Sequence, residues 1–164
     1  MSAATAARLR TDDLWETSLF SSRPGTGRGW DAPTYDGIDD QLADSRSRLS
    51  RLSARAAYQE ALHGRAVLVD IRPQAQRTQE GEVHPGLAPL VIERNVLEWR
   101  LDPRSKARIE LAAPDRRVVV LCQEGYTSSL AADALLRLGL HRATDVAGGF
   151  AAWRDAGLPV ADAT

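Results

Sequence analysis

The stretch from Val118 to Leu136, VVVLCQEGYTSSLAADALL, constrains the fold more than any other part of the chain. It begins with a short run of β-branched and apolar residues, which is typical of a strand buried on both faces. It ends with apolar residues at helical spacing, and Gly139 follows where a helix should stop. Cys122 and Gly125 lie in the loop between these two segments. A strand that leads directly into a helix indicates an α/β fold, in which sites lie at the carboxyl ends of parallel strands.

The same alternation of strand and helix patterns extends from Ser50 to the end of the chain. Strands are predicted at residues 66–71, 117–122 and 144–146, with a weaker candidate at 90–92. Helices are predicted from the N-cap residue Ser53 to Gly64, from Asn95, after Cys122, and from Gly148. In the helix after the cysteine we expect one face to carry Leu130, Ala134, Leu135 and Leu138. The pattern therefore predicts an α/β sandwich with a mostly parallel sheet.

Residues 1–48 form a separate region in this interpretation. They include a segment rich in Gly, Pro, Ser and Asp, residues 21–37, that has no sustained apolar period, so we expect an extension without a core of its own. The composition favours a flexible leader, whereas four large apolar residues favour docking on the domain or on a second subunit: Trp15, Leu19, Phe20 and Trp30. Both alternatives remain open. We expect the extension to be dispensable for the chemistry, because every catalytic feature that the sequence indicates lies after Ala66.

Composition and charge exclude several classes of function. The net charge is −1 without a basic stripe, which argues against a nucleic-acid partner. No run of about 18 apolar residues and no signal-peptide pattern occur, so we expect a cytoplasmic protein without a membrane partner. The single cysteine cannot form an internal disulfide, and the three histidines, His63, His84 and His141, lie far apart. We therefore expect neither a metal site nor another cofactor.

The position of Cys122 has a chemical consequence. The loop must turn into a helix whose first backbone N–H groups have no partner within the helix, and these groups would point toward the sulfur. Unpaired amides and the helix dipole stabilise an anion, which favours a thiolate nucleophile. Gly125 suits such a loop because it adopts positive φ, and Thr127 or Ser128 could cap the helix or bind a charged ligand. The alternative is that Cys122 is only a small buried apolar residue at a strand end.

Three sequence blocks carry a resemblance to a known family. They are AVLVDIRP at residues 66–73, GEVHPG at 81–86, and the cysteine loop followed by DVAGGFAAWRDAGLPV at 145–160. Together they make the core from about Leu52 to Val160 similar to a single-domain rhodanese, a sulfurtransferase that carries sulfur as a cysteine persulfide. The resemblance implies a rhodanese-like three-layer α/β/α sandwich with a mostly parallel central sheet.

The resemblance also implies roles for individual residues. Cys122 would be the catalytic nucleophile, moving sulfane sulfur from thiosulfate or another small-molecule donor to a thiol or cyanide acceptor. The active-site loop that binds the substrate would comprise six residues: Gln123, Glu124, Gly125, Tyr126, Thr127 and Ser128. Asp70 and Arg72 would be structural, since a carboxylate beside the sulfur opposes a thiolate. We interpret His84 as a surface turn residue, and Gly148, Gly149 and Trp153 as a tight junction and a packed aromatic.

The loop distinguishes between related chemistries. Phosphatases of similar architecture place an arginine six residues after the cysteine to bind phosphate, and here that position is Ser128. Arsenate reduction is also disfavoured, because a second cysteine is missing. Gln123 and Thr127 stand where many thiosulfate-using relatives have a basic residue, and Glu124 adds a negative charge, so thiosulfate is expected to be a poor donor. A persulfide carrier for a protein partner and a rhodanese-like interaction module remain alternatives.

Overall fold

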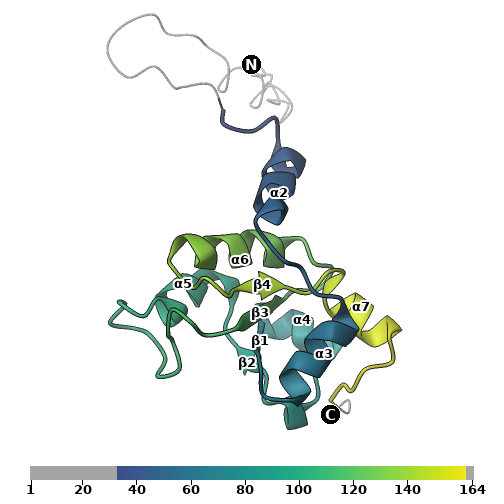
Figure 1. The fold of residues 1–164 in the computed structure, drawn as a ribbon. Coiled ribbons are helices and arrows are strands. Elements are labelled where there is room, and N and C mark those ends of the chain that lie inside the picture. Colours follow the sequence, from purple (N-terminus) through teal and green to yellow (C-terminus); the bar gives the residue numbers. More distant parts are fainter. Residues whose placement is uncertain (1–32, 162–164) are drawn as a thin grey trace, which may run out of the picture. The chain divides into compact units, whose positions relative to one another are not determined.

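A computed structural model of the chain describes residues 33–161. Its centre is a four-stranded sheet in which all strands are parallel, in the order β2-β1-β3-β4 (Figure 1). The strands are β1 (Val67–Asp70), β2 (Leu90–Val91), β3 (Val118–Leu121) and β4 (Thr144–Asp145). All four predicted strands are confirmed, although each is shorter than the apolar pattern predicted.

The pairing of β1 and β3 brings two candidate site segments together. Asp70 is the register partner of Leu121, and the Ile71 N–H donates to the Leu121 carbonyl at 3.0 Å. The segments that follow both strands therefore begin at the same edge of the sheet. This is the edge at which parallel α/β folds place their sites.

Helices cover both faces of the sheet (Figure 1). Those in the described residues are α2 (Ile38–Ser47), α3 (Ala54–Leu62), α4 (Gln74–Glu80), α5 (Leu97–Leu101), α6 (Thr127–Arg137) and α7 (Gly149–Asp155), with short 3-10 turns at Pro85–Leu87 and Arg94–Val96. The predicted N-cap of α3 is confirmed, because the Ser53 hydroxyl accepts from the Ala56 N–H at 3.2 Å. Helices α2 and α4 were not expected from the sequence.

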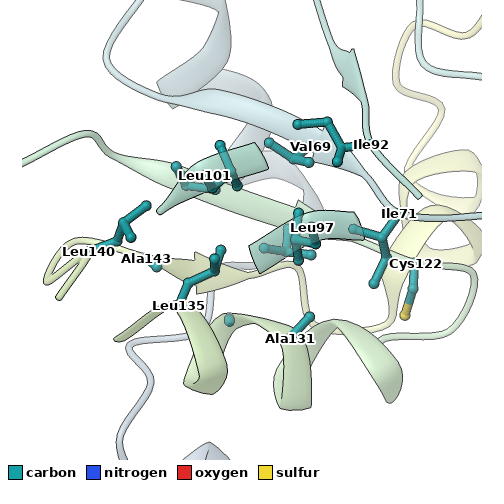
Figure 2. Packing of buried hydrophobic residues seen from close by; sticks show 13 residues of the cluster. Val69, Ile71, Ile92, Leu97, Leu101, Cys122, Ala131, Leu135, Leu140 and Ala143 are labelled. Carbon is teal, nitrogen blue, oxygen red and sulfur yellow. The ribbon is translucent and has the colours of Figure 1, made fainter. Parts of the chain in front are cut away.

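Alternate residues of β3 enter two separate cores. Val118 and Val120 pack with α5 and α6 on one face, and Val119 and Leu121 pack with α3 and α7 on the other. The Cys122 side chain belongs to the first core (Figure 2). Phe150 and Trp153 of α7 are fully buried in the second core, which confirms the interpretation of Trp153 as a packed aromatic. The predicted three-layer α/β/α arrangement is therefore confirmed.

The expected buried face of α6 was partly wrong. Leu135 is buried as predicted, but Leu130, Ala134 and Leu138 are only partly buried. The buried positions also include polar ones: Ser128, Ser129, Ala131, Ala132, Asp133 and Leu135. The reason is that α6 packs against the sheet on one side and against α2 on another, and the second contact buries polar groups.

Helix α2 lies within the region predicted to be an extension, and it packs on α6. Leu42 and Ser45 are buried in this contact, and the Ser45 hydroxyl donates to Asp133 at 3.3 Å. The helix belongs to the same compact unit as the sheet, which starts at Tyr35. Trp15, Leu19, Phe20 and Trp30, which bear on the docking of the extension, lie outside the described residues. Among the described helices, none has the length and apolar character needed to cross a membrane.

Candidate active site

Cys122 directly follows β3 at the carboxyl edge of the sheet. Its side chain packs beside Ile71, the residue that follows β1 (Figure 2). The residue is buried, with 8% of its surface exposed. The sequence placed the cysteine at this edge, and the structure agrees.

Two backbone N–H groups point at the sulfur. Those of Gly125 and Ser128 lie 3.2 and 3.3 Å from the Cys122 Sγ. Gly125 has a φ of +78°, and a Cβ there would come within 2.7 Å of the Gly148 nitrogen, so the loop requires glycine at this position. The predicted cradle of amides around the sulfur is therefore present, and it favours the thiolate electrostatically.

The hydroxyl of Ser128 does not cap the helix. Tyr126 is the residue that precedes α6, and no side-chain cap bond occurs at this helix start, so the expectation that Thr127 or Ser128 caps it was wrong. The Ser128 hydroxyl instead donates to the buried Asp145 carboxylate at 2.8 Å. It also accepts a hydrogen bond from the Cys122 thiol at 3.2 Å.

Asp70 and Arg72 are a buried ion pair beside the loop. The Arg72 Nη2 lies 2.7 Å from the Asp70 Oδ2, and the Arg72 backbone N–H also donates to Asp70. The guanidinium further donates to the Gly81 carbonyl and to the Gln123 Oε1, and it lies 4.0 Å from the centre of the Phe150 ring. These contacts hold three loops together, so both residues have the structural positions that the sequence predicted.

Gln123 takes part in the scaffold and not in the opening of the site. Its amide oxygen accepts from Arg72, and its amide nitrogen donates to Glu80 of α4 at 3.0 Å. Both ends of the side chain are thus occupied. The sequence placed Gln123 in the loop that would bind the donor, and the structure adds that its amide ties this loop to Arg72 and to α4.

The exposed members of the loop are Glu124, Tyr126 and Thr127. Tyr126 is 57% exposed, and the Arg46 guanidinium lies 5.4 Å from the centre of its ring. We call these three exposed side chains of the loop the rim. The rim therefore combines one negative charge, an aromatic surface and a hydroxyl group.

The start of α7 holds the backbone of the cysteine loop. The Phe150 N–H donates to the Cys122 carbonyl at 2.8 Å, and the Ala151 N–H donates to the Gln123 carbonyl at 2.9 Å. Gly149 has a φ of +60°, and a Cβ there would lie 2.7 Å from the Gln123 carbonyl carbon. The adjacent glycines therefore allow close packing of two backbone segments, as the sequence interpretation of this junction proposed.

Three charged residues that support the loop were missed in the sequence. The Gly125 carbonyl accepts from the Nη2 of Arg46 and from the Nη2 of Arg51, each at 2.9 Å. Arg51 also forms an ion pair with Asp145, whose carboxylate is fully buried and which lies at the end of β4. The expectation that every catalytic feature lies after Ala66 did not include these supporting contacts, because no local pattern marks contacts between segments so distant in sequence.

A comparison with protein-family models matches residues 53–156 to the rhodanese-like domain, and this range covers more than half of the chain. The chain belongs to the rhodanese-like family. Solved structures agree with this assignment. A protein of unknown function from Rhodopseudomonas palustris, described as a possible tyrosine phosphatase, is 30% identical with a TM-score of 0.69, over 84% of this chain and 100% of that one.

Two sulfurtransferase structures share the fold. The polysulfide-sulfur transferase homodimer of Wolinella succinogenes is 24% identical with a TM-score of 0.61, over 74% of this chain and 84% of that one. A thiosulfate sulfurtransferase of Pseudomonas aeruginosa is 22% identical with a TM-score of 0.59, over 77% of this chain and 23% of that one.

Arg46 and Arg51 precede the residues that match the rhodanese-like model, so part of the loop support in this chain lies before the family domain.

A hollow of about 200 Å³ lies at the carboxyl edge of the sheet. Its lining residues come from the segments after β1 and β2: Ile71, Pro73, Glu93, Arg94 and Asn95. Ile71 is the lining residue that also belongs to the core containing Cys122. His84 lies elsewhere, in an exposed turn where its Nδ1 accepts from the Gly86 N–H at 3.0 Å, as the sequence predicted for a turn residue.

Proposed function

We propose that this rhodanese-like protein is a sulfurtransferase in which Cys122 carries sulfane sulfur as a persulfide. The observation that carries the proposal is the pair of backbone N–H groups aimed at the Cys122 Sγ at 3.2 and 3.3 Å. Amides that converge on a sulfur stabilise a thiolate and also the negative charge of a bound persulfide. Membership of the rhodanese-like family supports the same chemistry.

The reaction has two displacements at sulfur. The Cys122 thiolate forms a bond to the sulfane sulfur of the donor, and the donor S–S bond breaks with its electron pair on the leaving group, which is sulfite or a thiolate. The acceptor, a thiolate or cyanide, then forms a bond to the outer sulfur of the persulfide. The Cys122 thiolate is regenerated, and no net oxidant or reductant is needed.

The rim of the site bears on the choice of donor. Glu124 is exposed in the loop, and the Gln123 amide is bound to Arg72 and Glu80, so neither residue offers a positive charge to an anion. Thiosulfate has two negative charges, and one like charge at a few Å costs on the order of 1 kcal/mol in water. We assign low-molecular-weight or protein persulfides as better donors than thiosulfate. The exposed Tyr126 ring supports a donor or acceptor with apolar surface.

Phosphate-ester hydrolysis is less well supported, although one related structure is described as a possible tyrosine phosphatase. The position six residues after the cysteine is Ser128, whose hydroxyl is bound to Asp145. Arg46 and Arg51 direct one nitrogen each to the Gly125 carbonyl. A phosphatase loop needs a guanidinium that binds the phosphate oxygens directly.

Mass spectrometry of the intact protein tests the proposal. Incubation with glutathione persulfide should add one sulfur atom to Cys122, and later addition of cyanide should remove it as thiocyanate. Thiosulfate should load the same residue more slowly. The matched variant Cys122→Ser should neither gain sulfur nor release it. Full cyanide-dependent release by Cys122→Ser would overturn the assignment of the carrier, and faster loading from thiosulfate would overturn the assignment of the donor.

A further inference from the structure

Asp145 is a buried carboxylate next to the sulfur site that the reaction described above does not use. It is the last residue of β4 and is fully buried. Arg51 donates to it from Nε at 2.8 Å and from Nη2 at 3.1 Å. The hydroxyls of Ser128 and Ser129 donate to its Oδ2 at 2.8 and 2.9 Å. Each of these four hydrogen bonds is one that the carboxylate accepts.

This carboxylate fixes the direction of the Ser128 hydroxyl group. A hydroxyl has one proton to donate, and an ionised carboxylate can only accept. The Ser128 proton is therefore directed at Asp145, and a lone pair of the Ser128 oxygen faces Cys122. The contact between the Cys122 Sγ and the Ser128 Oγ, at 3.2 Å, is then a hydrogen bond that the thiol donates. A thiolate or a persulfide has no proton on this sulfur and cannot make it.

Hydrogen bonds of opposite polarity thus meet at one sulfur atom. The N–H groups of Gly125 and Ser128 favour the charged sulfur, whereas the Ser128 hydroxyl oxygen favours the protonated thiol. In the thiolate, the lone pair of that oxygen would face a negative charge. The balance between the two forms therefore depends on Asp145, although Asp145 does not contact the sulfur through a hydrogen bond of its own.

We propose that Arg51 and Asp145 are positioning residues that set the protonation balance of Cys122 through the Ser128 hydroxyl. Arg51 forms an ion pair with Asp145, and Asp145 turns the hydroxyl so that it accepts from the thiol. The unloaded thiol is thereby stabilised relative to the thiolate and the persulfide. This inference rests on the proposed function, in which Cys122 is the sulfur carrier.

Other charged groups surround the loop and must stay unchanged in the test. They are Arg46 at the end of α2, the Asp70–Arg72 pair after β1, Glu80 in α4 through its contact with Gln123, and Glu124 in the loop. Each is present in wild type and in all variants named below. Differences between the variants therefore report the Arg51–Asp145–Ser128 arrangement.

The experiment measures the rate at which iodoacetamide alkylates the full-length protein as a function of pH. Because the chain contains one cysteine, the intact mass reports Cys122 alone. Ser128→Ala removes the acceptor of the thiol proton and leaves both N–H groups in place. The midpoint of the pH profile should fall by about half a pH unit or more, the size of one ordinary hydrogen bond.

Ser129→Ala is the matched control. It also removes a hydroxyl that contacts Asp145, together with the contacts of that hydroxyl to the Gly125 carbonyl and the Arg46 Nε. This hydroxyl is not bonded to the sulfur, so the midpoint should not fall. Asp145→Asn removes the negative charge and should lower the midpoint. Arg51→Gln leaves the carboxylate charge uncompensated and should raise it, whereas Arg51→Lys, which keeps the charge, should restore it toward the wild-type value.

A merely structural role predicts a different result. Loosening of the loop would withdraw the N–H groups from the sulfur and raise the midpoint in every variant. A rise in Ser128→Ala, or equal shifts in Ser128→Ala and Ser129→Ala, would overturn the inference even if the ion-pair variants fail to fold. Alkylation requires no sulfur donor. Failure of persulfide loading would therefore count against the proposed function but would not affect the inference about Arg51 and Asp145. An unexpected alkylation profile would count against that inference but not against the proposed function.

Discussion

Gly149 shows how a single residue without a side chain holds the sulfur site together. It lies between β4 and the body of α7, where the N–H groups of Phe150 and Ala151 reach the carbonyls of Cys122 and Gln123. A Cβ at this position would lie 2.7 Å from both the carbonyl carbon and the carbonyl oxygen of Gln123. The obstacle is backbone, so it cannot move aside as a flexible side chain would. The helix can approach the loop this closely only with glycine at position 149.

Gly149→Ala should therefore destabilise the protein and disturb the loop. A left-handed backbone costs an alanine about 1 kcal/mol, and the clash with Gln123 should at least double this cost. Urea unfolding measures the loss of stability, and sulfur loading of Cys122 measures the effect on the loop. Loading should be slower because the Cys122 and Gln123 carbonyls lose their partners.

The variant Gly157→Ala separates the cost of a left-handed backbone from the cost of a steric clash. Gly157 has a similar φ of +67°, but an added Cβ there meets no atom within 4 Å. It should show the backbone cost alone, with normal loading of Cys122. If the two alanine variants were equally stable and equally active, the close approach at Gly149 would have no energetic importance.

The extent to which the site could be predicted depends on sequence distance. Cys122, Gly125 and Ser128 lie in one loop, so their arrangement follows from the strand-to-helix turn. The arginine contacts to the Gly125 carbonyl join residues 79 and 74 positions apart, and no local pattern reports them. The scaffold contact of Gln123 could not be predicted for the same reason, because its partner Glu80 lies 43 positions away.

At the scale of elements, the strongly apolar segments were the predictable ones. Strand β3 consists of consecutive buried apolar residues, and β1 has the same character except that Val67 is partly buried and the buried terminal residue is Asp70. Helix α4, QAQRTQE, was missed because its one buried residue is Arg77, which leaves no apolar period to detect. Helix α2 was missed because it buries only Leu42 and Ser45. Both short polar helices depend on tertiary contacts for their stability.

The contact between α2 and α6 is held by charged side chains. Arg48 bonds to Asp133 of α6 at 2.6 Å and to Asp44 of α2 at 2.8 Å. Its hydrogen bond lowers the pKa of Asp44 from 3.8 to about 2, with a further contribution from the Tyr35 hydroxyl. The hydrogen bond from Arg48 also lowers the pKa of Asp133, although burial partly opposes this effect. We call these three residues, Asp44, Arg48 and Asp133, the α2–α6 clasp.

The clasp predicts a specific loss of stability in acid. A carboxylate whose pKa is lower in the folded state contributes stability above its unfolded pKa and loses it as the pH falls through the folded value. The contribution of Asp44 should therefore be complete above about pH 4 and should be lost toward pH 2. Thermal unfolding should show wild type more stable than Arg48→Gln near pH 6, with the difference shrinking as the pH falls to 2.

Arg55→Gln provides the comparison for this measurement. Arg55 is an exposed arginine that hydrogen-bonds the Ala156 carbonyl oxygen, a group that does not titrate. Its stability difference from wild type should stay constant over the same pH range. A constant difference for Arg48→Gln as well would show that the clasp does not stabilise the fold.

At the scale of the whole molecule, the active-site loop is supported by chain that precedes the family domain. The rhodanese-like match begins at residue 53, but Arg46 and Arg51 hold the Gly125 carbonyl, and α2 covers α6 directly behind the loop. The sequence pattern alone led us to expect that residues 1–48 are dispensable. The contacts of α2 lead to a different expectation for the part of this region that begins at Tyr35.

Two truncations should therefore behave differently. Removal of residues 1–32 leaves α2 and all the contacts described above in place, and the unfolding temperature and the rate of sulfur loading should remain close to those of the full chain. Removal of residues 1–48 eliminates Leu42, Arg46 and Arg48. Loss of the buried Leu42 alone costs about 2 kcal/mol, which lowers the unfolding temperature by roughly 5 to 10 °C.

The longer truncation should also affect the chemistry, because the Gly125 carbonyl loses Arg46 and retains Arg51. Loading of Cys122 should be slower but still measurable, since both N–H groups that face the sulfur belong to the loop itself. Arg46→Gln in the full chain isolates this contribution from the loss of α2. It should slow loading with less effect on the unfolding temperature than the truncation has. If removal of residues 1–48 changed neither the unfolding temperature nor the rate of sulfur loading, α2 would not support the active-site loop.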